Sequence, residues 1–207
     1  FLSVLPGETV TFDIDFENTG TGDDHIDISR EGDYPADWTV SIASQLAILH
    51  EQTVTKKLTV SIDEDTSPGE YHIELTGISS DDPKIPPFER DVTITINVEQ
   101  MYNLTASIGT DTTSIDPFPQ TASRKVTFKF SVNNTGTGAD KFKFTAAFDA
   151  TPVRKTGWSV AFSPATIDLG VNEEDMIDAT VQVPYKENID TYGISIKVES
   201  EGDTSVF

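Results

Sequence analysis

Acidic residues gather in short segments of this chain, and one segment has part of the spacing of a calcium-binding loop. Asp63-Glu64-Asp65 is followed by Glu74, which stands near the position where such a loop places its last ligand. Calcium prefers several hard oxygen ligands on a flexible loop, so Asp63 and Asp65 are candidate ligands and calcium is the one candidate cofactor. Pro68 stands where the EF-hand loop requires glycine, which favours the alternative of solvated acidic turns.

The residues that catalyse hydrolysis or group transfer do not occur here in a recognisable arrangement. His25, His50 and His72 form no metal-spaced pair such as His-x-x-x-His, and each is expected on a solvent-facing strand position. The chain has no cysteine, and therefore no disulfide, thiolate metal site or cysteine nucleophile. No Gly-x-Ser-x-Gly segment is present either. We expect no catalytic residues and no enzyme.

Two glycine-containing segments, Asn18-Thr19-Gly20-Thr21-Gly22 and Asn134-Thr135-Gly136-Thr137-Gly138, invite comparison with a phosphate-binding loop. The dinucleotide fingerprint needs a third glycine, and His25 or Lys141 stands there instead. The flanking strand patterns also supply no helix N-terminus for a phosphate. We interpret both segments as hairpin turns, with glycines that allow positive φ and an asparagine that bonds local backbone, and expect no cofactor-binding residues.

Aromatic residues are the candidates for a binding surface. Trp38 and Trp158 stand at equivalent points of an internal repeat, which favours two core anchors over two sugar-stacking platforms. Should the chain bind carbohydrate or protein, the expected exposed aromatics are Tyr34, Phe88, Tyr102 and Phe118. Asn103-Leu104-Thr105 and Asn133-Asn134-Thr135 match the glycosylation acceptor pattern, and Asn133 is expected at the more exposed turn.

The elements that would position these residues are strands. Thr9–Phe16 alternates strictly, with Val10, Phe12, Ile14 and Phe16 on one face, and Val126, Phe128, Phe130 and Val132 repeat the pattern. This period of two predicts half-buried strands, and further strands are expected at 25–28, 58–62, 71–75, 92–98 and 102–106. No segment keeps a helical period. Short strands at this spacing predict an all-β protein of immunoglobulin-like sandwiches.

The order of motifs appears twice, which predicts two tandem domains. Val10-Thr11-Phe12 returns as Val126-Thr127-Phe128, and Trp38-Thr39-Val40 returns as Trp158-Ser159-Val160. We place the domains at residues 1–100 and 101–207 and expect a short, rigid junction. The second copy lacks a counterpart of residues 90–98, so its last strand is expected to be truncated and the chain to be a fragment of a longer polypeptide.

The charge of the chain limits its partners. Its formal net charge is −21, with 35 acidic and 14 basic residues among 207. Such a field repels nucleic-acid phosphates and anionic membrane surfaces. No run of 18 apolar residues exists, so no membrane insertion is predicted. The remaining candidates are neighbouring domains of a longer polypeptide, other copies of the protein, and carbohydrate.

These motifs resemble a known group of domains. The order Pro-Gly-Glu-Thr-Val-Thr-Phe, Asn-Thr-Gly, Trp-Thr-Val and Pro-Gly-x-Tyr is similar to that of the NEW3 and CARDB class of immunoglobulin-like repeats. The second copy departs from it, since Asp190 replaces Gly69. The resemblance implies extracellular modules of archaeal or bacterial cell-surface and surface-layer proteins. The expected function is therefore a non-enzymatic structural or spacer module; the alternative is an accessory module that binds carbohydrate or protein for a secreted hydrolase or adhesin.

Overall fold

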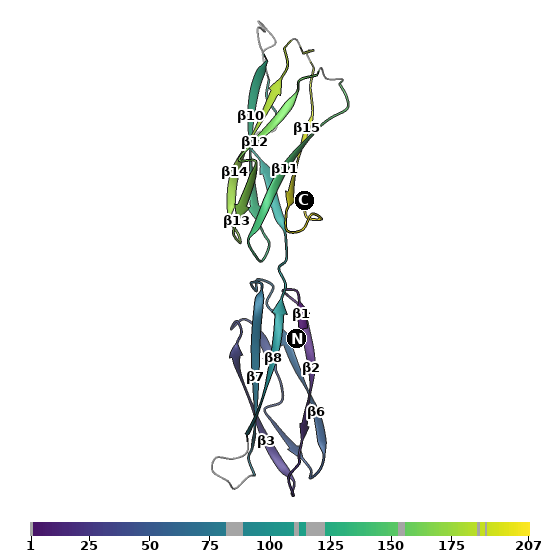
Figure 1. The fold of residues 1–207 in the computed structure, drawn as a ribbon, viewed down its shortest axis with the longest axis vertical. Coiled ribbons are helices and arrows are strands. Elements are labelled where there is room, and N and C mark those ends of the chain that lie inside the picture. Colours follow the sequence, from purple (N-terminus) through teal and green to yellow (C-terminus); the bar gives the residue numbers. More distant parts are fainter. Residues whose placement is uncertain are drawn as a thin grey trace. The chain divides into compact units, whose positions relative to one another are not determined.

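The computed structural model describes residues 2–81, 89–109, 112–114, 123–152, 156–185, 187–188 and 190–207. The elements of these residues are all strands. None of the described residues forms a helix long and apolar enough to cross a membrane. The chain divides into two compact units, Phe1–Met101 and Tyr102–Phe207 (Figure 1).

The described strands number eight in the first unit and seven in the second. Those of the first unit are β1 (Leu2–Val4), β2 (Thr9–Glu17), β3 (Asp24–Asp33), β4 (Thr39–Ser41), β5 (Gln45–Ile48), β6 (Thr53–Ser61), β7 (Gly69–Ser79) and β8 (Glu89–Val98). Those of the second unit are β9 (Leu104–Ile108), β10 (Arg124–Asn134), β11 (Asp140–Phe148), β12 (Ser159–Ser163), β13 (Thr166–Leu169), β14 (Glu174–Val183) and β15 (Ile194–Ser200).

The first unit is built from two sheets that share a core. Their strand orders are β1-β8-β7-β3-β5 and β2-β6-β4. Ile73 and Ile96 of one sheet and Leu58 and Val60 of the other are fully buried in the same cluster. The predicted alternation of β2 is confirmed, because its apolar side chains are half-buried and its polar ones exposed. Opposite faces of each strand therefore serve the core and the solvent.

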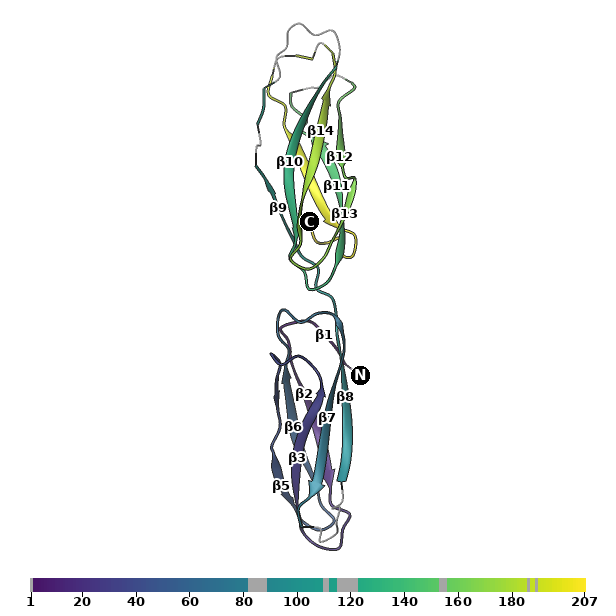
Figure 2. The same cartoon turned by 90° about the vertical axis from the view of Figure 1, so that its left-hand side faces the viewer.

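The second unit repeats this arrangement with larger aromatic side chains. Its sheets have the orders β12-β14-β10-β9 and β13-β11-β15, and Figure 2 shows β9 lying along β10. Phe130 of β10 packs edge-to-face against Phe144 of β11, with 5.5 Å between ring centres. Phe142 and Ile177 are fully buried in the same core. Strands β2 to β7 thus correspond in order to β10 to β15.

One cross-strand ion pair recurs with its charges exchanged. Asp13 of β2 lies opposite Lys57 of β6, and their side chains meet at 2.9 Å. At the equivalent position Lys129 of β10 lies opposite Asp178 of β14, at 2.7 Å. All four side chains are well exposed, so each pair adds little to stability.

The two units differ at the edge of one sheet. In the first unit β7 lies between β3 and β8, and β8 also pairs in parallel with β1. In the second unit β15 pairs with β11, and no other strand of the described residues pairs with it. The first strand of the second unit, β9, pairs with β10 in the opposite sheet.

Candidate functional site

The two Asn-Thr-Gly-Thr-Gly segments form the same buried clamp in both units. The side-chain amide of Asn18 donates to the carbonyl oxygens of Gly22 (2.9 Å) and Ile48 (3.1 Å), and its Oδ1 accepts from the Gly20 N–H (2.9 Å). The amide thereby ties the β2–β3 turn to the end of β5. A buried amide with all these bonds satisfied holds one conformation firmly.

Asn134 repeats these contacts in the second unit. It donates to Gly138 O (2.9 Å) and Leu169 O (3.0 Å) and accepts from Gly136 N–H (2.9 Å). The predicted bonding of the asparagines to local backbone is confirmed. The predicted reason for glycine is wrong for the first turn, since Gly20 and Gly22 do not have positive φ. A Cβ on Gly20 would instead lie 3.0 Å from Asn18 Oδ1, so glycine is needed there for the close approach.

Trp38 is a core residue, as predicted. It is 5 % exposed and its indole N–H donates to Thr66 Oγ1 at 3.0 Å. Tyr34 stacks on it with ring centres 6.1 Å apart, and Tyr71 lies 5.0 Å away at a tilt. The Tyr71 hydroxyl donates to Ser67 O. The polar tips of Trp38 and Tyr71 are thus both bonded inside the protein.

Trp158 lies in a more open setting with partly different contacts, and the prediction of a core anchor is only half right for it. It is half-buried and does not belong to the buried core of its unit. Its indole N–H donates to the Glu187 carboxylate at 2.6 Å. Tyr192 and Phe148 lie beside the ring, with centres 4.9 and 5.8 Å away. This aromatic group with one carboxylate is the candidate binding surface of the second unit.

Glu187 also contacts the hydroxyl of Tyr192. The tyrosine hydroxyl donates to Asn188 O at 3.1 Å and to Glu187 Oε1 at 3.3 Å. Desolvation of the phenol is the main cause that raises the pKa of Tyr192 above 10.0, and the nearby negative charge of Glu187 raises this pKa further. The hydroxyl therefore stays protonated and acts as a hydrogen-bond donor at neutral pH.

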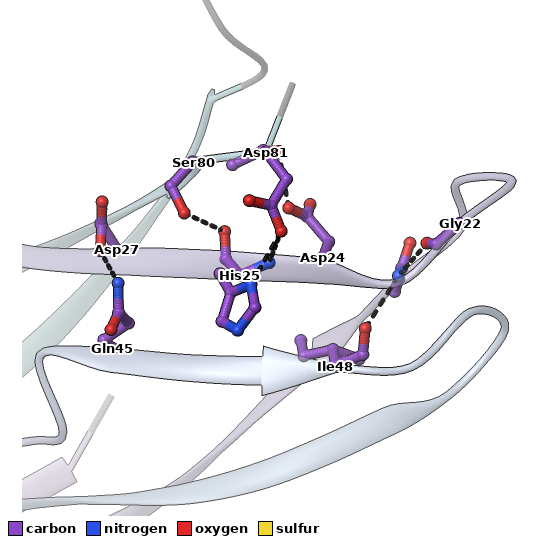
Figure 3. Close-up of polar contacts among 10 residues, drawn as sticks. Gly22, Asp24, His25, Asp27, Gln45, Ile48, Ser80 and Asp81 are labelled. Carbon is purple, nitrogen blue, oxygen red and sulfur yellow. Dashed lines mark hydrogen bonds and ion pairs between the residues drawn. The ribbon is translucent and has the colours of Figure 1, made fainter. Parts of the chain in front are cut away.

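His25 has one close acidic partner (Figure 3). Its Nδ1 lies 2.8 Å from Asp81 Oδ2, and the same carboxylate oxygen accepts the His25 backbone N–H at 3.1 Å. The hydrogen bond with Asp81 is the first cause that raises the pKa of His25 above 6.5, and the charges of Asp81, Asp24 and Asp27 add to this rise. Both side chains are about half exposed, so water screens the pair.

The other histidines and the calcium candidates lie apart from one another. His50 belongs to the β5–β6 turn, where its Nδ1 contacts Gly20 O. His72 of β7 contacts the hydroxyl of Thr95 in β8. Asp63 Oδ1 accepts the backbone N–H of Asp65, so this pair makes a local turn. Within the described residues no three acidic, histidine or cysteine side chains gather as a metal site would require. Calcium binding at Asp63 and Asp65 stays a prediction.

The two glycosylation candidates differ in access. Asn103 is exposed just before β9. Asn133 lies inside β10 between Glu174 of β14 and Thr105 of β9, and it is half-buried, so the expected exposed turn is not its position. Asn103 is therefore the better placed acceptor. Of the expected surface aromatics, Tyr34 packs on Trp38 in the first unit and Tyr102 is half-buried in the second; Phe88 and Phe118 fall outside the described residues.

A cavity of about 200 Å³ lies between the sheets of the first unit. Ile14, Phe16, Ile26 and Val92 line its apolar wall, and Gly77 of β7 leaves space there. Gly77 faces Ile28 across β3, whereas its counterpart Val198 faces Phe144 across β11 and is buried. The glycine therefore accounts for part of this gap, whose lining also includes Asp15, Glu17 and Arg90.

The comparisons with known proteins find a similar family for part of the first unit. Residues 4–77 match the model of the NPCBM-associated, NEW3 domain of alpha-galactosidase, which confirms the resemblance for this part of the chain. No match was found among curated proteins.

Solved structures give only distant similarities. The secreted serine protease VesC from Vibrio cholerae is 10 % identical with a TM-score of 0.37, over 100 % of this chain and 49 % of that one. This chain thus spans about half the length of the protease. The CsuC–CsuE chaperone–tip adhesion subunit complex from Acinetobacter baumannii is 11 % identical with a TM-score of 0.34, over 99 % and 91 % of the two chains. Scores this low support no conclusion on function.

Proposed function

We propose that the chain is a non-catalytic, extracellular structural module made of two tandem immunoglobulin-like sandwiches. The domains are residues 1–100 and 101–207, and the second is a further NEW3/CARDB-like copy. The chain joins or spaces neighbouring domains in a longer prokaryotic protein. That protein is a cell-surface or surface-layer protein, with an archaeal source as our first proposal, or a secreted hydrolase. The NEW3 match favours a role beside a catalytic domain, because its description attaches the domain to alpha-galactosidase.

The observation that carries this proposal is the repeated clamp of Asn18 and Asn134. The asparagine side chains and the glycine N–H groups of these segments bond to each other and hold the turns, in the same way in both units. They are therefore not free to bind a ligand. The indole N–H groups of Trp38 and Trp158 are likewise bonded inside the protein. Groups that serve the fold in both copies are those expected of a spacer.

Single-molecule pulling on the 207-residue chain tests this function. Two independent spacer units should give two unfolding events, each releasing about 35 nm, since about 100 residues extend by ~0.35 nm each. One event of about 70 nm, or a gradual extension without a force peak, would contradict the proposal.

Carbohydrate binding is the second candidate function, and the half-exposed aromatic group around Trp158 favours it. Galactomannan, a galactose-bearing polysaccharide, is the probe, because the NEW3 description names an alpha-galactosidase. Binding should retard the chain in affinity electrophoresis, and Trp158→Ala should abolish the retardation while Trp158→Phe retains part of it. Equal mobility with and without the polysaccharide would leave the spacer function alone.

A further inference from the structure

The two units differ at the edge of β15 that lies away from β11, which has no strand partner among the described residues. In the first unit β7 bonds to β3 on one side and to β8 on the other. In the second unit the described residues supply a partner for β15 on one side only. Unpaired strand edges are templates for the addition of another strand.

The backbone geometry tells which groups of β15 face this edge. The N–H of Glu201 donates to Lys141 O, towards β11, and the N–H of Ser200 donates to Val206 O, on the other side. Since successive residues of a strand point to alternate sides, the N–H and C=O groups of Ile194, Ile196 and Val198 face the open edge.

The core beside this edge is incomplete. Ile73 and Leu75 of β7 are 0 % and 3 % exposed, because β8 adds its own apolar side chains to the core. Their counterparts on β15, Ile194 and Ile196, are only half-buried.

The apolar side chains along the gap are therefore of the kind that an added strand covers in the first unit. Burying them would contribute roughly 25 cal/mol for each Å² removed from water.

The residues after β15 already turn towards the gap. Asp203 N–H donates to Ser200 Oγ and Val206 N–H donates to Asp203 O, which closes a tight turn. Val206 consequently lies beside Ser200 on the side away from β11. The Phe207 ring then lies over the side chain of Lys197, 3.9 Å from its Nζ. The backbone is thus directed back along β15, antiparallel to it.

We propose that the edge of β15 away from β11 accepts an added strand, in the place that β8 takes along β7, and that the turn at Val206 lies where this strand begins. The segment that fits is an extended one with apolar side chains at alternate positions, like residues 90–98 of the first unit, and it would cover Ile194 and Ile196. The second unit is therefore a strand acceptor. This inference does not depend on the proposed function.

Grafting the strand of the first unit onto the second tests the proposal. Arg90 lies opposite Gly77, and the counterpart of Gly77 is Val198, so a copy of residues 90–98 attached directly after Phe207 keeps the register. Backbone amide exchange of Ile194, Ile196 and Val198 should then slow by at least about tenfold. The thermal midpoint of the second unit should rise by about 5 °C, and that of the first unit should not change.

The matched control carries aspartate in place of all four alternating apolar residues of the attached copy (Val92, Ile94, Ile96 and Val98), which keeps the length and removes the apolar face. Slower exchange in the first graft and not in the control supports the proposal. Unchanged exchange in both, or equal slowing in both, overturns it. Protected β15 amides in the ungrafted chain together with a dimeric mass would show instead that the edge pairs between two copies.

Discussion

Trp38 and Trp158 stand at equivalent positions, and the indole N–H of each donates to an equivalent loop, β6–β7 in the first unit and β14–β15 in the second. The acceptors in these loops nevertheless differ in kind. Trp38 is buried and bonds to the neutral hydroxyl of Thr66. Trp158 is half-buried and bonds to the carboxylate of Glu187. A carboxylate costs several kcal/mol to bury without a counter-charge, whereas a hydroxyl with a hydrogen bond does not. The acceptor therefore stands at the same position in both units, and it is charged only where the ring is partly exposed to water.

Replacing the two tryptophans should break this equivalence most strongly. Trp38→Ala should destabilise the first unit by about 3–5 kcal/mol, the cost of emptying a large buried site. Trp158→Ala should cost the second unit about half as much, since its ring leaves water only in part. Calorimetric unfolding of each variant gives both values, with Trp38→Phe and Trp158→Phe as milder controls. Equal losses would mean that both rings act as core anchors.

The asparagine clamps should differ less than the tryptophans. Asn134→Ala removes three buried hydrogen bonds, whereas Asn18→Ala removes one buried bond and two part-buried ones. Each change should cost about 2–4 kcal/mol in the unit concerned, with the larger loss for Asn134→Ala. Urea unfolding followed by amide signals of each unit measures this loss, and the exposed Asn103→Ala serves as the control. A loss near zero in either unit would show that the turn holds without its clamp.

The pair Gly77 and Val198 should give effects of opposite sign. In Gly77→Ala the new Cβ would lie 3.3 Å from Ile26 Cγ2, and Ile26 can move into the neighbouring cavity. This variant should stabilise the first unit by up to ~1 kcal/mol, because alanine also loses less backbone entropy than glycine. Val198→Ala should destabilise the second unit by about 2 kcal/mol. The same unfolding experiment decides both, and a destabilising Gly77→Ala would mean that Ile26 is held rigidly.

The smallest difference between the units is their response to pH near neutrality. All three histidines belong to the first unit, and the pKa of His25 is raised by its bond to Asp81. A raised pKa stabilises the folded state below the ordinary value of 6.5, and this contribution is lost as the pH rises through the folded pKa.

Asp81→Asn should return the pKa of His25 towards 6.5 and flatten this slight pH dependence of the first unit. An NMR titration of the His25 imidazole, in the variant and in the unchanged protein, measures this pKa. An unchanged pKa of His25 would place the cause with Asp24 and Asp27 instead.

What the sequence could predict depended on whether a feature is local. The alternation of residues 9–16 predicts β2 and its inner face, because side-chain direction follows from the strand itself. The half-burial of Trp158 was not predictable from its similar local motif, since burial depends on which distant segments cover the ring. The same holds for Asn133, whose exposure is limited by the strands on both sides. The role of Gly20 was not predictable either, because residue type alone does not show that its backbone lies close to Asn18 Oδ1.

The Asp13–Lys57 and Lys129–Asp178 pairs have exchanged charges, and this bears on folding. Two units with such similar strands can pair a strand of one with a strand of the other. Were β2 to align with β14, Asp13 would meet Asp178; were β10 to align with β6, Lys129 would meet Lys57. Each wrong partnership brings like charges together, whereas each right one brings opposite charges together. A contact that contributes almost nothing to the finished protein can thus help to sort its halves before either is complete.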